Sequence, residues 1–523
     1  MFETIDSLHL PNQSPLYQEF LKNENWRFAN FGYSLINLDD DFEKRSRVLE
    51  KREFDYKLLG FQIEKYMQPF GLSEKTKSNL DKFQKSNCVC VVTGQQPSLF
   101  GGPIYNFYKV ITAIKLARQW EEKTNIPCVP VFWNASNDHD LEEGNRFFYL
   151  DKHRRLAKTK VDGLPNLPLD KIKVGNAISQ MKAQIEKEMG RIDFLSDAWN
   201  IFLPDSNDTI GTWQTRILNH IFKDKGLLIV EPHIFKHQSK KTYSHLLPFE
   251  DQFIKQIQLN STALKNKNFH VQVDEKVSSR FMMYQANKGR YRLQKQSDHW
   301  VLGNQRWGLS ELLSEVEKED VDVSPDALLR PIWQDMNLPV AAYVAGPGEI
   351  AYYHQLKGCY EIFGMQMPLI VPRISGSIFE KNHLKFLGQF KVPIHHFFEL
   401  YQWGKVPTIS SERPSDALSG LFLKWGENAK TPSEIKIFKD FQAKAEKMNR
   451  KYYDKLEASR MNINETGNKQ LQEWKDFLYP RQQYQERIFS VLPFYARHGP
   501  SFLNFLDEAK YEFGKHFMYS VND

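Results

Sequence analysis

The sequence predicts an α/β protein with a Rossmann-like parallel sheet at its core. Short apolar runs rich in β-branched residues occupy 88–92, 127–135 and 226–233, and each of them runs into a polar cluster. An amphipathic stretch with helical periodicity begins at Pro103, between the first two runs. A strand, a loop, a helix and a second strand within about 50 residues form a βαβ unit, which builds a parallel sheet through a right-handed crossover. Residues 338–373 supply another strand, helix and strand of the same kind.

The bulk composition is that of a globular protein in a reducing compartment. Hydrophobic residues make up 41% of the 523 residues and charged residues 26%, which excludes wholesale disorder. Four cysteines are too few for a disulfide framework in a chain of this size. The chain has neither a long apolar segment nor the basic and apolar start of a signal peptide, so we expect a cytoplasmic protein without a membrane partner. The net charge of +6 arises from interspersed signs, so no nucleic-acid partner is expected.

Two insertions are expected to divide the core. Residues 151–225 are polar and irregular before a helical stretch, and residues 266–325 contain alternating segments around a turn at Asn287, Lys288 and Gly289. The predicted layout is an N-terminal helical segment over 1–85, the first half of the core over 86–150, insertion one over 151–225, a core strand and helix over 226–265, a small antiparallel insertion two over 266–325, the second half of the core over 326–375, and a helical coiled-coil arm over 376–523.

Within the arm, apolar side chains recur at steps of three or four and form a coiled-coil-like seam. The seam residues are Phe438, Phe441, Ala445, Met448, Tyr452, Leu456 and Ser459. An Asn-rich stretch at 462–469 predicts a break before a second helix, which is interrupted at Pro480, so that the two helices would form an antiparallel hairpin. The seam favours a homodimer contact, but periodicity does not distinguish this from packing within the chain.

The loop after the first core strand is a candidate anion site. It places backbone N–H groups and a helix N-terminus at the carboxyl edge of the sheet. Its glycines fit neither the dinucleotide nor the P-loop spacing, and a plain tight turn remains the alternative. The predicted binding residues in this region are Gly94, Gln95, Gln96, Gly101, Gly102, Pro103 and Tyr105.

A second polar cluster follows the next strand, at 134–143. Asn134 and Asn137 are candidate binding residues, and His139 lies between Asp138 and Asp140. A histidine beside carboxylates can serve as a general base, so these last three are the predicted catalytic residues. The alternative is that the aspartates cap a helix. Two oxygens and one nitrogen at this spacing are weak evidence for a metal site, and no metal ligand is predicted.

A third cluster opens the helix after the strand at 338–345. Gly346 and Gly348 lie at its mouth, and Glu349 can hold a substrate ammonium group. Arg330, just before this strand, is a candidate carboxylate clamp or a buried structural arginine. The pair Cys88 and Cys90 shares one face of a strand and is expected to be part of the core.

In these blocks the sequence resembles the cysteine-adding enzyme family of bacillithiol synthesis, the BshC or cysteine ligase family. The resemblance covers nearly the whole chain, because several unusual blocks occur in one order. They are residues 10–21, 91–117, 130–143, 346–357, 367–373 and 485–499.

The resemblance implies a Rossmann-like core similar to class I aminoacyl-tRNA synthetases, two connecting insertions and a C-terminal coiled-coil domain used for dimerisation. It also implies a ligase that joins the carboxyl group of cysteine to the amine of glucosaminyl-malate, the final step of bacillithiol synthesis. The implied partners are these two small molecules and a second subunit.

The sequence departs from the synthetases at their nucleotide-binding motifs. In place of the His-x-Gly-His and Lys-Met-Ser-Lys-Ser blocks stand residues 101–109 and 373–381. Arg373, Ser375 and Ser377 in the second block can meet a phosphate or form a polar helix start. ATP is thus one candidate cofactor, and the sequence leaves the acyl donor open. The rival functions are another acyl-activating or nucleotidyl-transferring α/β enzyme and a non-catalytic dimeric scaffold.

Overall fold

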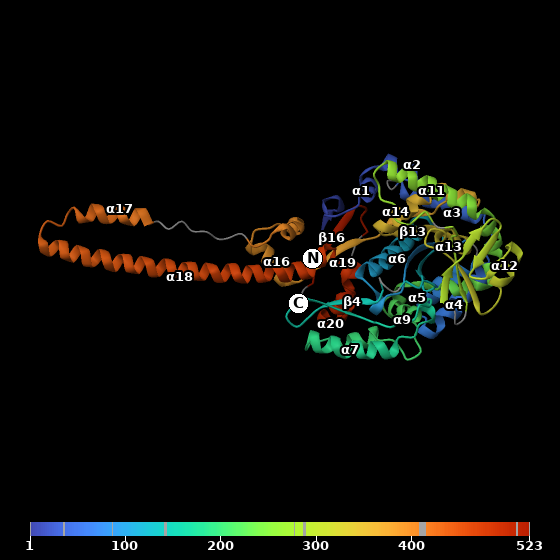
Figure 1. The fold of residues 1–523 in the computed structure, drawn as a ribbon, viewed down its shortest axis with the longest axis horizontal. Coiled ribbons are helices and arrows are strands. Elements are labelled where there is room, and N and C mark those ends of the chain that lie inside the picture. The colour runs from blue at the N-terminus through green and yellow to red at the C-terminus, as the bar shows by residue number, and fades with distance from the viewer. Residues whose placement is uncertain are drawn as a thin grey trace. The chain divides into compact units, whose positions relative to one another are not determined.

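The computed structural model describes residues 2–34, 37–85, 87–140, 144–276, 278–285, 289–406, 415–508 and 511–521 (Figure 1). The chain forms two compact units, Met1–Glu380 together with Gln483–Asp523, and Lys381–Gln482. The expected turn at Asn287 and Lys288 lies outside the described residues. Within the described ranges, no helix is both long and apolar enough to cross a membrane.

The larger unit is built on a five-stranded parallel sheet, which confirms the predicted fold class. Its strands are β2 (Val89–Gln95), β3 (Cys128–Asn134), β6 (Leu228–Val230), β13 (Val340–Ala345) and β14 (Leu369–Pro372). They lie in the order β14-β13-β2-β3-β6. Almost every residue of these strands is buried, because helices cover both faces, and the predicted core residues Cys88 and Cys90 are fully buried.

The strand order reverses between β2 and β13. After β2 the chain proceeds to β3 and β6 on one side, and it returns to β13 and β14 on the other side. The loops at the carboxyl ends of β2 and β13 therefore diverge, which opens a crevice for a ligand in doubly wound sheets. The helices that begin beside this crevice are α6 (Ile104–Thr124) and α14 (Pro347–Gln355).

Helices from the N-terminal segment pack around the sheet. They are α1 (Pro15–Lys22), α2 (Glu24–Phe31), α3 (Leu38–Glu50), α4 (Tyr56–Met67) and α5 (Glu74–Gln84). Ser73 caps α5 by accepting a hydrogen bond from the backbone N–H of Thr76. Helices α10 (Ser239–Leu246), α11 (Glu250–Asn266), α13 (Arg330–Asn337) and α15 (Cys359–Ile362) complete this layer.

Two stretches of the larger unit lie outside the parallel sheet. The first contains the hairpin β4 (Arg146–Leu150) and β5 (Leu156–Lys160), followed by α7 (Gly175–Met189), α8 (Leu195–Phe202) and α9 (Ile210–Phe222). The second contains two antiparallel sheets and α12 (Leu309–Val316). One sheet has the order β12-β7-β8, from β7 (Phe281–Gln285), β8 (Gly289–Arg292) and β12 (Val321–Pro325); the other consists of β9 (Gln294–Gln296), β10 (His299–Leu302) and β11 (Gln305–Trp307).

Both ends of the chain differ from the all-helical expectation. The strand β1 (Phe2–Asp6) pairs with β16 (Lys515–Ser520), which also pairs with β15 (Ser375–Phe379). β16 forms because it buries Phe517 and Met518 against the larger unit, a tertiary gain that the periodicity of residues 376–523 does not reveal. The short helices α19 (Gln485–Ile488), α20 (Leu492–His498) and α21 (Asn504–Glu508) also belong to the larger unit.

The smaller unit is dominated by one helix, α18 (Pro432–Leu478). The predicted break at 462–469 is wrong, because the helix continues through it. Gly467 there serves close packing: a Cβ at this position would lie 3.2 Å from side-chain atoms of Phe390 and Val406. The helix ends just before Pro480, as expected.

The hairpin in this unit differs from the predicted one. Helix α17 (Ser415–Gly426) runs beside the first part of α18 (Figure 1), where the ring of Phe422 packs against Phe438 and Phe441. The unit also contains α16 (Lys381–Gln389) and a 3₁₀ helix at Ile394–Gln402. Farther along the predicted seam, Met448 and Tyr452 are 73% and 59% exposed. The described part of the unit therefore leaves these seam residues uncovered.

Candidate ligand cleft

A cleft of about 450 Å³ lies at the carboxyl edge of the parallel sheet. Residues from all three predicted polar clusters line it, together with residues from insertion two. The sequence-predicted residues among them are Gly94, Gln95, Gln96, Asn137, Asp138, His139, Asp140, Arg330 and Glu349. The structure thus brings together side chains that are up to 255 positions apart in the sequence, from Gly94 to Glu349. This is the crevice where the strand order reverses.

The wall formed by β2 and α6 is fixed by a buried lysine. The side chain of Lys109 is 2% exposed, and its Nζ lies 2.5 Å from Oε2 of Glu349. The same Nζ donates hydrogen bonds to the carbonyl oxygen of Gly94 at 2.8 Å and to Oε1 of Gln95 at 2.7 Å. Burial lowers the pKa of Lys109, and Glu349 opposes this shift. Lys109 therefore ties the end of β2 to the first turn of α14.

The opposite wall carries Glu349 with two tyrosines and an arginine. Oε1 of Glu349 accepts a hydrogen bond from the hydroxyl of Tyr343 at 2.8 Å, and Oε2 accepts one from the backbone N–H of Gly346 at 2.8 Å. Arg330 donates to the hydroxyl of Tyr352 at 2.8 Å and to Oε1 of Gln334 at 3.1 Å. Glu349 already has an internal cation in Lys109, so a substrate ammonium group would share this carboxylate.

The loop after β3 holds the predicted catalytic residues. Oδ1 of Asp138 accepts hydrogen bonds from the backbone N–H groups of His139 at 2.7 Å and Asp140 at 3.2 Å. These bonds form a local turn rather than the helix cap left open by the sequence, because the next element in the described part of the chain is the strand β4. Nδ1 of His139 lies 3.5 Å from Oδ1 of Asp138 and 3.2 Å from Nη1 of Arg290. Burial acts against ionisation of Asp138, but hydrogen bonds from His139 and the charge of Arg290 outweigh it and lower the pKa to about 2.

Insertion two supplies a positively charged side to the cleft. Arg290 of β8 is 6% exposed and bonds both Asp138 and the hydroxyl of Ser324, at 3.2 and 2.9 Å. Arg292, two residues along the same strand, is 39% exposed and contacts Asp326 at 3.4 Å. With Arg330, three guanidinium groups therefore face a cleft that also contains carboxylates. The arrangement fits ligands that carry both signs of charge.

Several predicted residues lie outside this cleft. Gly101 and Gly102 are buried in a tight turn with positive φ, where the N–H of Gly102 donates to the carbonyl oxygen of Leu99. Pro103 precedes α6 and pairs with Ser490. The plain-turn alternative thus describes this part of the loop.

The other predicted residues outside the cleft face different neighbours. The ring of Tyr105 lies 5.7 Å from Nζ of Lys109 and 5.3 Å from Cζ of Arg373. Asn134 is fully buried and donates to the carbonyl oxygen of Gly211 at 2.9 Å. Gly346 binds Glu349 through its backbone, and Gly348 lines a separate hollow beside Arg373.

The block at 373–381 forms a strand rather than a helix start. Arg373 pairs with the buried Glu486 at 2.6 Å, and Ser375 and Ser377 bond the two ring nitrogens of His516. Arg373, Ser375 and Glu486 line the separate hollow rather than the cleft. The polar-helix-start expectation for this block is therefore wrong, because β15 pairs with β16 there.

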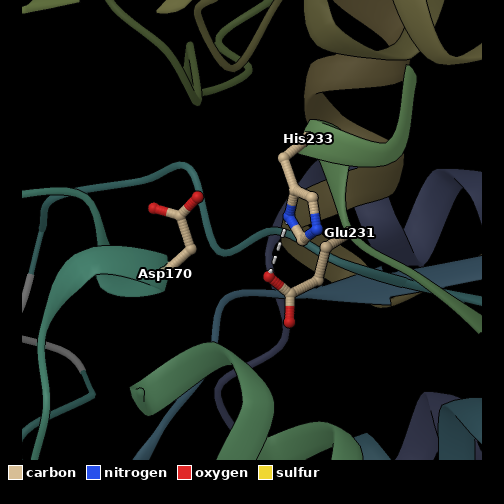
Figure 2. Close-up of side chains that lie close together, drawn as sticks. All are labelled: Asp170, Glu231 and His233. Atoms are coloured by element: carbon tan, nitrogen blue, oxygen red, sulfur yellow. Dashed lines mark ion pairs between the residues drawn. The ribbon is translucent and has the colours of Figure 1, made fainter. Parts of the chain in front are cut away.

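A second polar cluster lies next to the cleft. Asp170, Glu231 and His233 offer one oxygen or nitrogen each, and these atoms lie within 4.8 Å of one another. Figure 2 shows the three side chains converging from separate segments of the chain. Burial raises the pKa of Asp170 to about 6.

Sequence reasoning missed Lys109, Arg290, Arg292 and this second cluster. Lys109 sits in an amphipathic stretch where a lysine is ordinarily on the solvent face. The arginines belong to an insertion far along the chain. A signal for the cluster was the Glu231-Pro232-His233 run directly after β6, which resembles the polar strand ends that were used for the cleft.

We predict that Lys109→Met strongly destabilises the larger unit. The substitution leaves Glu349 without its buried cation, which costs about 3–5 kcal/mol for a buried ion pair. Denaturant unfolding followed by tryptophan fluorescence measures the loss. The matched control is Lys82→Met, whose ion pair with Glu121 is 31% exposed on each side, and which should cost at most about 1 kcal/mol. Equal losses for the two variants would contradict a structural role for the Lys109 pair.

Comparisons with known proteins agree with this fold. Residues 4–374 match the family model described as "Bacillithiol biosynthesis BshC, N-terminal Rossmann-like domain", and residues 428–519 match "Bacillithiol biosynthesis BshC, C-terminal coiled-coil domain". Relatives named "Putative cysteine ligase BshC" include one from Lysinibacillus sphaericus, 25% identical over 98% of both chains. Others are from Salinibacter ruber, 27% identical over 88% of this chain and 87% of the relative, and Chlorobium phaeobacteroides, 29% identical over 68% and 64%. The chain therefore belongs to the BshC family of bacillithiol-biosynthesis ligases.

Proposed function

We propose that this ligase joins the carboxyl group of cysteine to the free amine of glucosaminyl-malate, as the final step of bacillithiol formation in the cytoplasm. The observation that carries the proposal is the mixed charge of the cleft at the strand-order reversal. Cysteine is a zwitterion, and glucosaminyl-malate combines one amine with two carboxylates. Such ligands need both cationic and anionic contacts in one site.

The partly exposed Arg292 is the proposed contact for a malate carboxylate. Its neighbour Arg290 already bonds Asp138 and Ser324 through both Nη atoms. Arg292 reaches the cleft, and the contacts that its side chain makes, to the carbonyl oxygen of Ser279 at 2.9 Å and to Asp326 at 3.4 Å, use Nη1. An arginine binds a carboxylate through two parallel N–H bonds, which fixes orientation as well as charge. A non-catalytic scaffold has no use for this arrangement, which favours an enzyme.

The bond to be formed sets what the cleft must do. The amine nitrogen attacks the carbonyl carbon of cysteine, a C–N bond forms, one carboxyl oxygen leaves with its activating group, and the nitrogen loses a proton. A free carboxylate does not undergo this attack at neutral pH, so an activated acyl donor is required. We propose that the carboxyl group of cysteine is activated at the expense of ATP, and this is the first mode of activation to test.

The direct experiment is incubation of the pure protein with cysteine, glucosaminyl-malate and ATP, with mass spectrometry of the thiol product. We expect bacillithiol to form, and the analogous amide from serine or alanine to form far more slowly. Omission of ATP tests the donor separately from the acceptor. Efficient amide formation with a different amine, and none with glucosaminyl-malate, would support a different acyl-activating enzyme instead.

We propose His139 as the general base that takes the proton from the attacking amine. This role requires the proton of the neutral imidazole to lie on Nδ1, toward Asp138, so that Nε2 can accept. Asp138 favours that tautomer, while Arg290, at 3.2 Å from Nδ1, opposes it. The 33% exposure of the side chain leaves it within reach of a ligand in the cleft.

We therefore predict that His139→Gln lowers kcat by about 10²–10⁴ while the KM for glucosaminyl-malate changes little, the usual range for loss of a general base. Steady-state kinetics of amide formation measures both constants. Arg306→Gln, on the separate sheet of β9, β10 and β11, is the control and should keep wild-type kinetics. Near wild-type turnover of His139→Gln would leave the imidazole as a positioning residue for Arg290.

We also propose that the smaller unit mediates homodimerisation. Met448 and Tyr452 continue the seam of α18 and stay exposed within the described part of their unit. A second copy that packs on this seam would remove these apolar side chains from water.

The double variant Met448→Glu and Tyr452→Glu is expected to be monomeric, with unchanged melting of the larger unit. Light scattering gives the mass. The control places the same charges at Lys447 and Lys451, which neighbour the seam residues along α18 and should leave the dimer intact. A wild-type protein that is already monomeric would contradict the proposed contact.

A further inference from the structure

We propose that Asp170, Glu231 and His233 bind one divalent transition-metal ion, a site that is separate from the proposed ligase chemistry. The three residues come from the single 3₁₀ turn at Leu169–Lys171, from the position after β6, and from the 3₁₀ helix at Pro232–Gln238. Their candidate ligand atoms lie within 4.8 Å of one another, and Figure 2 shows the ion pair of His233 and Glu231 with the carboxylate of Asp170 beside it.

The first argument is an unsatisfied acceptor. The side chain of Asp170 is 9% exposed, and its Oδ1 is buried and has no hydrogen-bond partner among the residues that the structure describes. Lys171 reaches only the other oxygen, Oδ2, at 3.4 Å. A buried carboxylate oxygen without a donor is costly, and a bound cation satisfies it.

The second argument is the environment of Glu231, whose side chain is fully buried. The hydroxyls of Tyr66 and Ser136 donate to it, the latter at 2.6 Å, and the amide of Asn134 lies at 3.4 Å. Within the described ranges its one ion-pair partner is His233. Neutral donors that orient a carboxylate in this way are typical of the groups that surround metal ligands.

The third argument is geometry. Nδ1 of His233 lies 3.5 Å from Oε2 of Glu231. Two ligands bound to a tetrahedral Zn²⁺, each about 2.1 Å from the ion, are about 3.4 Å apart, so this pair is already at coordination distance. A carboxylate oxygen of Asp170 lies within 4.8 Å of both atoms and would complete the set by moving closer to the ion. His233 is 43% exposed and lines two adjoining hollows, which gives an ion a path from solvent.

The donor set selects the ion class. One imidazole nitrogen with two carboxylate oxygens suits Zn²⁺, Mn²⁺ or Co²⁺, whereas Mg²⁺ and Ca²⁺ prefer oxygen ligands alone. Three protein ligands leave a coordination position for water. We take Zn²⁺ as the probe.

The ion would also brace the loop that carries Asp138 and His139. The backbone N–H of Leu169 donates to the carbonyl oxygen of Asp138 at 2.8 Å, and that of Asp170 donates to the carbonyl oxygen of Ser136 at 3.0 Å. A metal that fixes Asp170 therefore fixes a segment bonded directly to this loop. The proposed consequence is structural, and it does not depend on the ligase reaction.

The test is calorimetric titration of the chelator-treated, tag-free full chain with Zn²⁺. We expect one ion per chain, far weaker binding of Mg²⁺, and an affinity at least about 100-fold lower in Asp170→Asn and in His233→Ala. The matched control is Asp322→Asn, because this 35% exposed carboxylate lines the same hollow but pairs with Lys236. It should bind Zn²⁺ as the wild type does.

Two further readouts keep the result interpretable. His233→Ala removes a partly exposed ring, so the metal-free variant should melt at the same temperature as the metal-free wild type. Added Zn²⁺ should raise the melting temperature of the wild type but not that of the variant. Co²⁺ bound to the wild type should give visible absorption bands that both ligand variants lack. Absence of saturable 1:1 binding, or equal binding by a folded His233→Ala variant, overturns the proposal.

Discussion

The buried pair of Lys109 and Glu349 is the interaction on which the cleft depends. Taking a lysine out of water is costly, and here the cost is offset by a carboxylate at 2.5 Å and by two further acceptors at the end of β2. Glu349 in turn bonds the hydroxyl of Tyr343 in β13. One ammonium group thus joins the two strands between which the order of the sheet reverses. Displacement of the Lys109 ammonium group would leave this lysine and Glu349 as unpaired charges in the interior. The two edges of the crevice are therefore held in one arrangement.

The parts of the fold that could be predicted are those set by local pattern. Apolar runs that end in polar clusters identified β2, β3, β6 and β13, and parallel pairing then brought Gln95, Asp138 and Glu349 to one edge. The break at 462–469 could not be judged in this way. A glycine among polar residues gives the same sequence pattern in a turn as in a helix that packs closely on apolar side chains. Only the tertiary contacts of Gly467, with Phe390 and Val406, decide between the two structures.

The missing half of the site lies in residues whose neighbours are remote in sequence. Arg290 reaches Asp138 across 152 positions because β8 belongs to a small sheet that folds over the crevice. No spacing rule connects such residues. Gly101 and Gly102 show the converse: their loop position favoured a ligand, whereas the structure places them outside the cleft lining, in a turn with positive φ angles and a bond to Leu99.

The loop after β3 separates two polar clusters, and this places constraints on both. Asn134 and Ser136 face Glu231, whereas Asp138 and His139 face the cleft, and Asn137 between them lines hollows on both sides. A chain of three to five residues has little freedom to move at one end while the other end is fixed. The carboxylate of Glu231 accepts from three donors, two of which, Asn134 and Ser136, lie at the start of this loop. These bonds fix the start of the loop, and they thereby restrict the position of the His139 imidazole relative to Arg290. The polar cluster around Glu231 therefore determines how precisely Asp138 and His139 are positioned to contact a ligand in the cleft, whatever reaction the cleft performs.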